Sequence, residues 1–332
     1  MPQPDRRDDT NVAIPPTLSH VIGQRQVVEK LRIATEAAWA DHAPLDHVLL
    51  TGPAGTGKSM LAKVLGDEMA GEFIESMGSA LTSPQALNGL LLSASSPNAI
   101  IFIDEVHEAL GSAQTALFKA IDERAVFVKE AYSDAITKLD LVPFTLVLAT
   151  TDPQRLLPPL RDRMRLVCQL SRYSTEDLAA LLRQKTTQLG WEVEDAALTQ
   201  IAQRGMGTPR LALRLLQSAR RTARAEGETT ISLAHAERTF SVEEVDAFGL
   251  GPDEQRYLRI LAESNSPVRV NVLATRLGQP MQAVTQVIES NLLWLGLIDR
   301  SDAGRALTAQ GMEHARLLLG RESRVSTASE EV

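Results

Sequence analysis

The residues with the clearest chemical potential are eight in a row, Gly52-Pro-Ala-Gly-Thr-Gly-Lys-Ser59. They match the P-loop pattern, in which glycines let backbone N–H groups turn towards phosphate oxygens. A helix that begins at the lysine adds the partial positive charge of its N-terminus. In this pattern Lys58 pairs with the β- and γ-phosphates and Ser59 ligates Mg²⁺. The octapeptide therefore predicts a site for ATP and Mg²⁺.

A second motif, Ile100-Ile-Phe-Ile-Asp-Glu105, places two adjacent carboxylates after an apolar run. A buried strand here would deliver Asp104 to the Mg²⁺ shell and place Glu105 to take a proton from the attacking water. An Asp-Glu pair is common in any chain, but this one follows a buried strand downstream of a P-loop. The combination predicts hydrolysis of the nucleotide and not binding alone.

Three further groups could sense or stabilise the γ-phosphate. Thr150 and Thr151 end an apolar run, where a hydroxyl can orient water, although a threonine at a strand end is common. Arg161 and Arg163 could supply an arginine finger to a neighbouring subunit's ATP, or could simply be solvated. Arg210 follows Gly207-Thr-Pro at a helix start and could fold back onto the phosphate or face solvent.

Alternating strands and helices must position these residues. Short apolar runs rich in β-branched and aromatic residues predict buried strands at 45–51, 99–104 and 144–150. Helical spacing of apolar residues occupies 58–69 and 113–122. This alternation predicts an α/β P-loop core, a parallel sheet covered by helices on both faces.

The chain has 332 residues, too many for one compact core, and its pattern changes after about residue 170. Helices are predicted at 175–189, 194–204, 209–225 and 232–240, and residues 248–252 indicate a linker. Three more helical stretches and a turn between short strands at 300–304 predict a winged helix. The expected domains are a flexible N-terminus at 1–17, an ATPase large domain at 18–172, a helical lid at 173–247, a winged helix at 248–320 and a disordered tail at 321–332.

Composition limits the possible partners. The net charge of −8 disfavours non-specific nucleic-acid binding by the chain as a whole, but residues 204–224 hold six arginines and no acid. The single cysteine, Cys168, excludes a disulfide framework and fits a reducing cytoplasm. No apolar run approaches the ~20 residues of a membrane span, and no apolar signal core begins the chain.

From about Leu18 to Leu318 the chain resembles the RuvB family, the AAA+ motors that drive branch migration of Holliday junctions. The P-loop and the Asp-Glu pair are shared by all AAA+ proteins and discriminate little. More particular are the segments Leu45-Asp-His-Val-Leu-Leu50, Gly207-Thr-Pro-Arg-Leu211 and Asp299-Arg-Ser-Asp-Ala-Gly-Arg305. The similar segments also include residues 21–24, 102–107, 143–146, 159–163 and 249–253.

The resemblance implies a role for individual residues. Catalysis would rest on Lys58, Asp104, Glu105, Thr151 (or Thr150) as first sensor, Arg163 as finger in trans and Arg210 as second sensor. Nucleotide contacts would come from Ile22, Gly52, Gly55, Thr56, Gly57, Lys58, Ser59, Met60, Arg163, Tyr173, Pro209 and Arg210, and Mg²⁺ ligands from Ser59 and Asp104. Arg300 and Arg305 would contact DNA phosphates.

The resemblance also implies an assembly. The working form in the family is a homo-hexameric ring on duplex or four-way-junction DNA. Residues 125–141 would form a protruding β-hairpin that docks RuvA, the junction-binding partner, through an apolar tip of Tyr132, Ala135 and Ile136.

Several positions depart from the family pattern. Ile14 stands in place of a nucleotide-contacting arginine, Asp152-Pro-Gln154 in place of Arg-Ala-Gly, and Met164-Arg165 in place of Phe-Gly. On the wing, Ala303 replaces the middle arginine of three, and the hairpin sequence also differs. These changes leave the hydrolytic residues intact but bear on RuvA docking and junction specificity, as expected of a divergent paralogue.

Two alternatives to a branch-migration motor therefore stay open. The segment 148–154 resembles a clamp-loader subunit, which favours a clamp-loader-like switch, although the chain lacks a Cys-rich zinc module. The acidic net charge and the altered wing favour a non-catalytic or protein-remodelling AAA+ adaptor that does not act on DNA.

Overall fold

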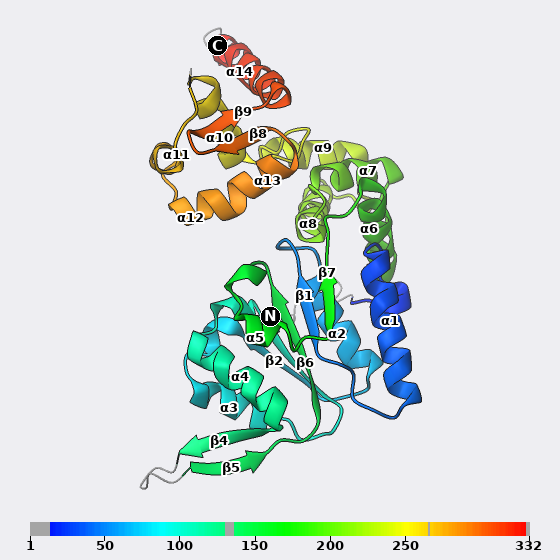
Figure 1. Ribbon diagram of the computed structural model, residues 1–332. Helices are drawn as coiled ribbons and strands as arrows, with labels where there is room; N and C mark the ends of the chain where they lie inside the picture. Colours follow the sequence, from blue (N-terminus) through cyan, green and yellow to red (C-terminus); the bar gives the residue numbers. More distant parts are fainter. Residues whose placement is uncertain (1–13, 130–135, 265, 330–332) are drawn as a thin grey trace, which may run out of the picture. The chain divides into compact units, whose positions relative to one another are not determined.

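The computed structural model describes residues 14–129, 136–264 and 266–329, with side chains described up to residue 319 except that of Lys129. Two compact units divide the chain at Gln217–Ser218, within helix α8 (Pro209–Ala225). The first unit contains the parallel sheet and the P-loop, and the second contains the wing (Figure 1). The predicted fold class, a P-loop core followed by helices and a winged helix, is confirmed.

Five parallel strands form the sheet in the order β2-β3-β6-β1-β7. Their bounds are Phe73–Met77 (β2), Ala99–Asp104 (β3), Phe144–Thr150 (β6), Val48–Thr51 (β1) and Leu166–Gln169 (β7). The register pairs Thr51 with Thr150 and Ile103 with Leu148, so Glu105 comes level with Thr150. Because parallel strands end at one edge, this register brings the P-loop, the Asp-Glu pair and Thr151 together.

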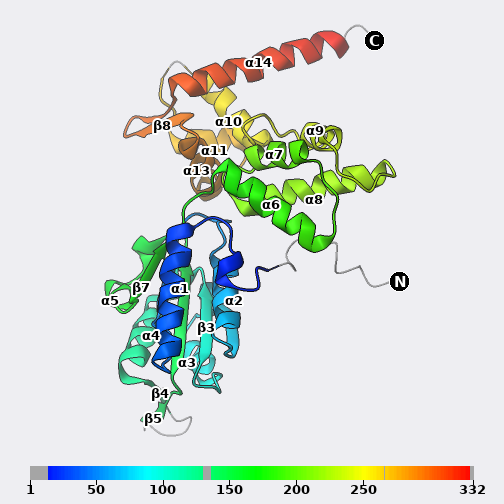
Figure 2. The same cartoon turned by 90° about the vertical axis from the view of Figure 1, so that its right-hand side faces the viewer.

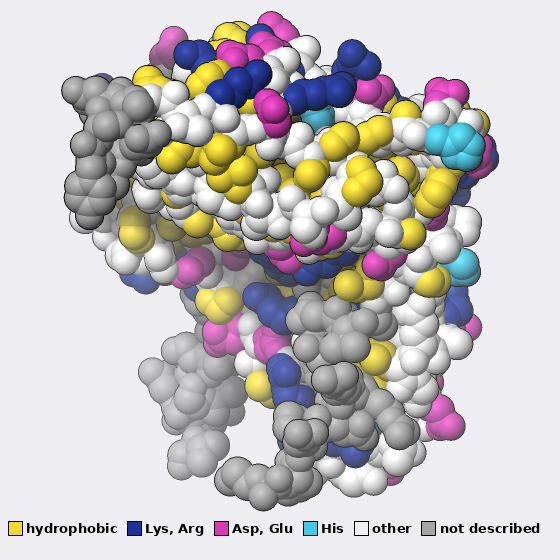
Figure 3. All heavy atoms as spheres, turned by 90° about the horizontal axis from the view of Figure 1, so that it is seen from below, with side chains coloured by type: hydrophobic (Ala, Val, Ile, Leu, Met, Phe, Trp, Pro, Cys, Tyr) yellow, Lys and Arg dark blue, Asp and Glu magenta, His cyan; other side chains and the backbone are white. Residues whose placement is uncertain are grey.

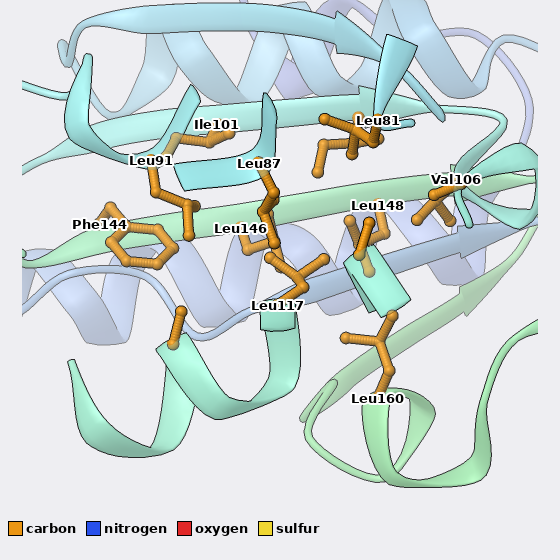
Figure 4. Packing of buried hydrophobic residues seen from close by; sticks show 14 of the residues in the cluster. Leu81, Leu87, Leu91, Ile101, Val106, Leu117, Phe144, Leu146, Leu148 and Leu160 are labelled. Atoms are coloured by element: carbon orange, nitrogen blue, oxygen red, sulfur yellow. The ribbon is translucent and has the colours of Figure 1, made fainter. Parts of the chain in front are cut away.

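Helices cover both faces of the sheet. One core cluster joins the sheet to α3 (Pro84–Leu92), α4 (Gly111–Glu123) and α5 (Pro158–Arg161) through buried side chains such as Leu87, Leu117 and Leu160 (Figure 4). A second joins the opposite face to α1 (Arg25–Ala40) and α2 (Lys58–Glu68), with Leu31 and Leu61 fully buried. Strands β1, β3 and β6 are buried on both faces, as their continuous apolar runs predict.

Short 3₁₀ turns complete the core at Leu18–His20 (η2), Gly78–Ala80 (η3), Val106–Glu108 (η4) and Pro153–Arg155 (η5). After β7 come α6 (Thr175–Leu189), α7 (Asp195–Arg204) and α8. The hydroxyl of Ser174 accepts a hydrogen bond from the backbone N–H of Asp177 and caps α6 at the residue that the sequence predicts.

The predicted hairpin is present as β4 (Ala125–Lys129) and β5 (Ile136–Asp140), an antiparallel pair that extends from the end of α4 (Figures 1 and 2). Phe127 and Ile136 are well exposed on it, with 44% and 67% of their surfaces accessible. Tyr132 and Ala135, expected at its tip, lie outside the described residues.

The second unit contains the rest of α8 and α9 (Leu233–Val242), α10 (Pro252–Ala262), α11 (Val270–Leu277) and α12 (Met281–Ala283). A π-helical turn at Val284–Ile288 leads into α13 (Glu289–Trp294). Strands β8 (Ile298–Ser301) and β9 (Gly304–Leu307) form the wing, and α14 (Ala309–Ser329) ends the unit. An isolated antiparallel β-bridge joins Val268 to Arg305 of β9, so a third segment of the chain pairs with the wing.

One expectation needs correction. The tail expected to be disordered from 321 continues α14 through Ser329 (Figure 2), because neither glycine nor proline follows Gly320 to end the helix. The predicted linker at 248–252 makes a tight turn, in which the Asp246 carboxylate accepts from the N–H groups of Phe248 and Leu250.

His47, in the segment that resembles the RuvB family, joins the start of β1 to β6. Its Nδ1 accepts a hydrogen bond from the backbone N–H of Leu146 at 2.9 Å, so the ring is neutral with its proton on Nε2. Burial lowers the pKa of His47 from 6.5 to about 4. The folded state therefore takes up the proton less readily than the unfolded chain does.

Because the folded pKa is the lower one, the contribution of neutral His47 to stability is full above pH 6.5 and is lost as the pH falls towards 4. The loss has a ceiling of roughly 3 kcal/mol. We expect His47→Asn, which keeps an acceptor but cannot titrate, to show a smaller fall in unfolding free energy between pH 7 and pH 4.5. Urea denaturation of both proteins measures this, and identical pH profiles would contradict the assignment.

Candidate nucleotide site

The loop between β1 and α2 has a backbone that only glycine adopts freely. Gly52, Gly55 and Gly57 have φ angles of 139°, 77° and 101°. A side chain at Gly52 would place its Cβ 2.4 Å from the carbonyl oxygen of Leu170. The hydroxyl of Thr56 donates to the Pro53 carbonyl at 2.8 Å and closes the turn. The glycines and this hydrogen bond together fix the turn of the loop.

Lys58 begins α2 and is buried, with 5% of its surface accessible. Its ammonium donates to the carbonyl oxygens of Gly52 and Pro53 at 2.9 and 3.0 Å. Burial lowers the pKa of Lys58, because two neutral carbonyls replace water only in part. A buried cation with uncharged partners at a helix N-terminus fits a phosphate group.

Ser59 and Asp104 meet across the strand end. The Ser59 hydroxyl donates to Oδ2 of Asp104 at 2.6 Å, and Oδ1 of Asp104 accepts from the backbone N–H of Glu105 at 2.9 Å. A hydroxyl and a carboxylate side by side form an oxygen donor set of the kind that Mg²⁺ prefers. The two predicted metal ligands are therefore adjacent.

Glu105 leaves β3 with a left-handed backbone, φ 45°. The backbone of Gly78 packs closely against it, since a Cβ on Gly78 would lie 2.2 Å from the Glu105 carbonyl oxygen. Its carboxylate Oε2 accepts from the backbone N–H and the hydroxyl of Thr151, at 3.0 and 2.9 Å. Of the two candidate sensors, Thr151 contacts Glu105. The hydroxyl of Thr150 instead lies 3.0 Å from Nδ1 of His107.

A cavity of about 550 Å³ brings most of the predicted hydrolytic residues together. It is lined by loop, strand-end and α8 residues, among them Lys58, Ser59, Asp104, Glu105 and Arg210. Sequence reasoning missed Arg214 and Gln217, which also line it. Their spacing of four and seven residues from Arg210 puts them on the same face of α8, and that helical spacing was the available signal.

An adjoining cavity of about 360 Å³ shares Gly57, Ser59, Met60, Pro209 and Leu213 with the first. Its remaining wall is largely apolar and includes Ile14, Pro15, Ile22 and Tyr173. Residues 14 and 15 were expected in a flexible lead-in but lie here, with Pro15 buried. Burial raises the pKa of Tyr173 to about 12, and its hydroxyl makes no hydrogen bond of normal geometry within the described residues. An apolar cavity beside the P-loop fits a nucleotide base.

Arg163 lies away from both cavities of its own chain. Its guanidinium forms a two-point ion pair with Asp122 of α4, donates to the Pro159 carbonyl at 2.6 Å and lies 4.9 Å from the centre of the Phe118 ring. It lines a separate cavity of about 640 Å³ with Arg124 and Arg165. Arg163 is thus held at a different surface from the P-loop residues.

The two wing arginines share one buried carboxylate. Glu289 is fully buried and accepts from Nε of Arg305 at 2.9 Å and from the Tyr257 hydroxyl at 3.0 Å. Arg300 reaches the same carboxylate at 3.2 Å. The Arg305 side chain is only 14% exposed, whereas that of Arg300 is 46% exposed. Of the two, Arg300 is therefore more available to a ligand.

Charged side chains are mixed on the face seen in Figure 3, where Lys and Arg lie among Asp and Glu and the side chains drawn in colour form no single broad basic area. Among the residues that the structure describes, no helix is both long enough and apolar enough to span a lipid bilayer.

Comparison with known families assigns all three parts of the chain to one group. Residues 14–170 match the Holliday junction DNA helicase RuvB P-loop domain, residues 173–246 the RuvB AAA lid domain, and residues 247–316 the RuvB C-terminal winged helix domain.

Individual proteins agree. The chain is 32% identical over 326 residues to the Holliday junction branch migration complex subunit RuvB of Rickettsia africae, covering 97% of this chain and 95% of that protein. It is 37% identical to that of Prochlorococcus marinus, covering 90% and 86%. Among solved structures, the Thermotoga maritima RuvB Holliday junction branch migration motor superposes with a TM-score of 0.81 at 31% identity, over 91% of this chain and 98% of that one. The chain belongs to the RuvB family of P-loop ATPases.

Proposed function

We propose that this protein is an ATP-hydrolysing motor subunit that moves duplex DNA and so drives branch migration of Holliday junctions in recombination and repair. The observation that carries the proposal is a single cavity lined by Lys58, Ser59, Asp104, Glu105 and Arg210 in a chain whose domains all match RuvB. Relatives named as branch migration complex subunits support a motor over a clamp-loader-like switch or a remodelling adaptor.

Nucleotide binding would use the two adjoining cavities together. The base would enter the apolar cavity beside Tyr173, Ile22 and Met60, and the triphosphate would lie along the P-loop. Lys58 would exchange its two carbonyl partners for phosphate oxygens, which relieves the cost of its burial. Mg²⁺, held by Ser59 and Asp104, would neutralise phosphate charge.

Hydrolysis would need a base and a sensor at the γ-phosphate. Glu105 lines the cavity and would take the proton of the attacking water. The Thr151 hydroxyl donates a hydrogen bond to the Glu105 carboxylate, and Thr151 would act as the sensor of the γ-phosphate. Arg210 and Arg214 on α8 would draw that helix towards the phosphates and change its position after cleavage.

The trans finger requires a ring. Arg163 is held at a surface remote from its own P-loop cavity, as a residue must be if it serves a neighbour's ATP. This supports a homo-oligomer, which we take to be the hexamer typical of the family.

DNA and the partner protein would bind at other surfaces. Arg300 and Arg305 would contact DNA phosphates. The β4–β5 hairpin, with Phe127 and Ile136 exposed, would dock a RuvA-like partner. The cytoplasm is the compartment in which such DNA lies.

The direct test is ATP turnover with and without a synthetic four-way junction, each with and without RuvA from the same source. Junction-stimulated turnover is the expected result, and native mass spectrometry should give six subunits. A protein that hydrolyses ATP without any response to DNA would support the remodelling alternative instead, and a pentamer would support the clamp-loader alternative.

Lys58→Met should reduce nucleotide affinity by roughly 10- to 100-fold, because it removes charge-assisted hydrogen bonds to phosphate. The apo protein should melt no lower than wild type, since the change removes a buried amine held only by carbonyls. Titration with a fluorescent ATP analogue and thermal unfolding measure the two effects. Lys30→Met, at an exposed lysine on α1, is the matched control, and equal affinity in Lys58→Met and wild type would refute the phosphate role.

Arg163→Ala should bind ATP normally but turn it over about 10³-fold more slowly, as loss of an arginine finger does. Mixing Arg163→Ala with Lys58→Met subunits should restore activity above either alone, because the second supplies a finger to the intact ATP site of the first. Arg183→Ala, at a surface ion pair on α6, is the control. No recovery on mixing would mean that Arg163 does not act in trans.

Arg300→Ala should lower the slope of log affinity against log salt for duplex DNA by about 0.9, since one phosphate contact is lost. The Arg300→Ala protein should lose little stability, because Glu289 keeps its contacts with Arg305 and Tyr257. Arg305→Ala should instead lower the unfolding free energy by roughly 1–3 kcal/mol, because it deprives buried Glu289 of a partner. Fluorescence anisotropy at several salt concentrations measures DNA affinity, and urea denaturation measures stability. Arg238→Ala is the control and should leave the slope unchanged. An unchanged slope in Arg300→Ala as well would exclude the DNA contact.

A further inference from the structure

We propose that His107 is a positioning residue that orients the carboxylate of Glu105 for its work as general base. The inference rests on the proposed ATPase activity, and it adds a residue for which the motifs of the sequence suggest no role. His107 lies two residues after Glu105, on η4, and its imidazole turns back towards the end of β6.

The contacts of the ring are specific. Nδ1 of His107 lies 3.1 Å from Oε2 of Glu105 and 3.0 Å from the hydroxyl oxygen of Thr150. The His107 side chain is 9% exposed and Thr150 is fully buried, so little water competes for these contacts. The Thr150 hydroxyl oxygen is fixed in turn, because it accepts from the backbone N–H of Asp152 at 3.0 Å.

These distances decide the tautomer. An ionised carboxylate can only accept hydrogen bonds, so a lone pair on Nδ1 at 3.1 Å from Oε2 would be repelled. The proton therefore lies on Nδ1, which donates to the Thr150 oxygen and presents its positive end to Oε2 of Glu105. His107 thereby links Glu105, the proposed base, to Thr150 at the end of β6, next to the sensor Thr151.

The arrangement divides the two oxygens of Glu105 between two tasks. Oε2 is approached by three donors, the N–H and hydroxyl of Thr151 and Nδ1 of His107. None of the described contacts involves Oε1. Gly78 already packs against the Glu105 backbone, so only side-chain rotation remains to be fixed. With Oε2 anchored, Oε1 is the oxygen left to accept the proton of water.

The role of the ring is testable because two amide side chains imitate different ring nitrogens. Asparagine at 107 can place an N–H near the position of Nδ1, whereas glutamine places it near Nε2. We expect His107→Gln and His107→Leu to lower kcat by about tenfold, a part of what a positioned base contributes. KM and the affinity for a fluorescent ATP analogue should not change, and His107→Asn should recover most of the loss.

A purely packing role would give another pattern, in which His107→Leu retains activity and the three variants follow their thermal stabilities. His42→Asn, at an exposed histidine in the loop after α1, is the matched control and should behave as wild type. Equal kcat in all three His107 variants and wild type would overturn the proposal.

A second readout needs neither nucleotide nor activity. In apo protein labelled with ¹⁵N-histidine, the Nδ1 resonance of His107, identified by its loss in His107→Asn, should shift in Glu105→Gln while the other five histidines stay in place. An unmoved resonance would show that the pair does not exist. Absence of ATPase in the wild-type protein would refute the proposed function instead, and the apo spectrum would still decide whether His107 holds Glu105.

Discussion

The register of three parallel strands is the constraint on which the candidate site depends. Thr51 pairs with Thr150 and Ile103 with Leu148, so the residues that follow each strand emerge at one level of one edge. A slip by one residue would turn the strand side chains to opposite faces and separate Glu105 from Thr151. The apolar clusters on both faces resist such a slip, so packing far from the nucleotide fixes the distances within the site.

Sequence predicted the parts whose chemistry is local. The P-loop, the Asp-Glu pair and the bounds of α6 and α8 follow from glycine spacing, apolar runs and helix caps, which act over a few residues. The glycines of residues 248–252 indicate a linker, but they do not predict how that linker is held in a packed turn. Its order comes from a carboxylate two residues upstream and from His314, which contacts the same carboxylate from α14 at 2.7 Å.

Long-range pairings could not be predicted in this way. Nothing near Arg163 in the sequence indicates that Asp122 holds it, since 41 residues separate them. The buried carboxylate shared by Arg300 and Arg305 belongs to α13, and motif comparison treats both arginines as equivalent surface cations. Burial distinguishes them, and burial is a property of the fold and not of the motif.

Helix α4 does more than cover one face of the sheet. Near its start the Gln114 side chain accepts from the backbone N–H of Leu157, Asp122 near its end holds Arg163, and the β4–β5 hairpin continues from its last turn. A helix of this length is a stiff rod of about 20 Å. A displacement of the hairpin therefore reaches the helix that restrains Arg163 through one connecting residue, Arg124, whose backbone is left-handed.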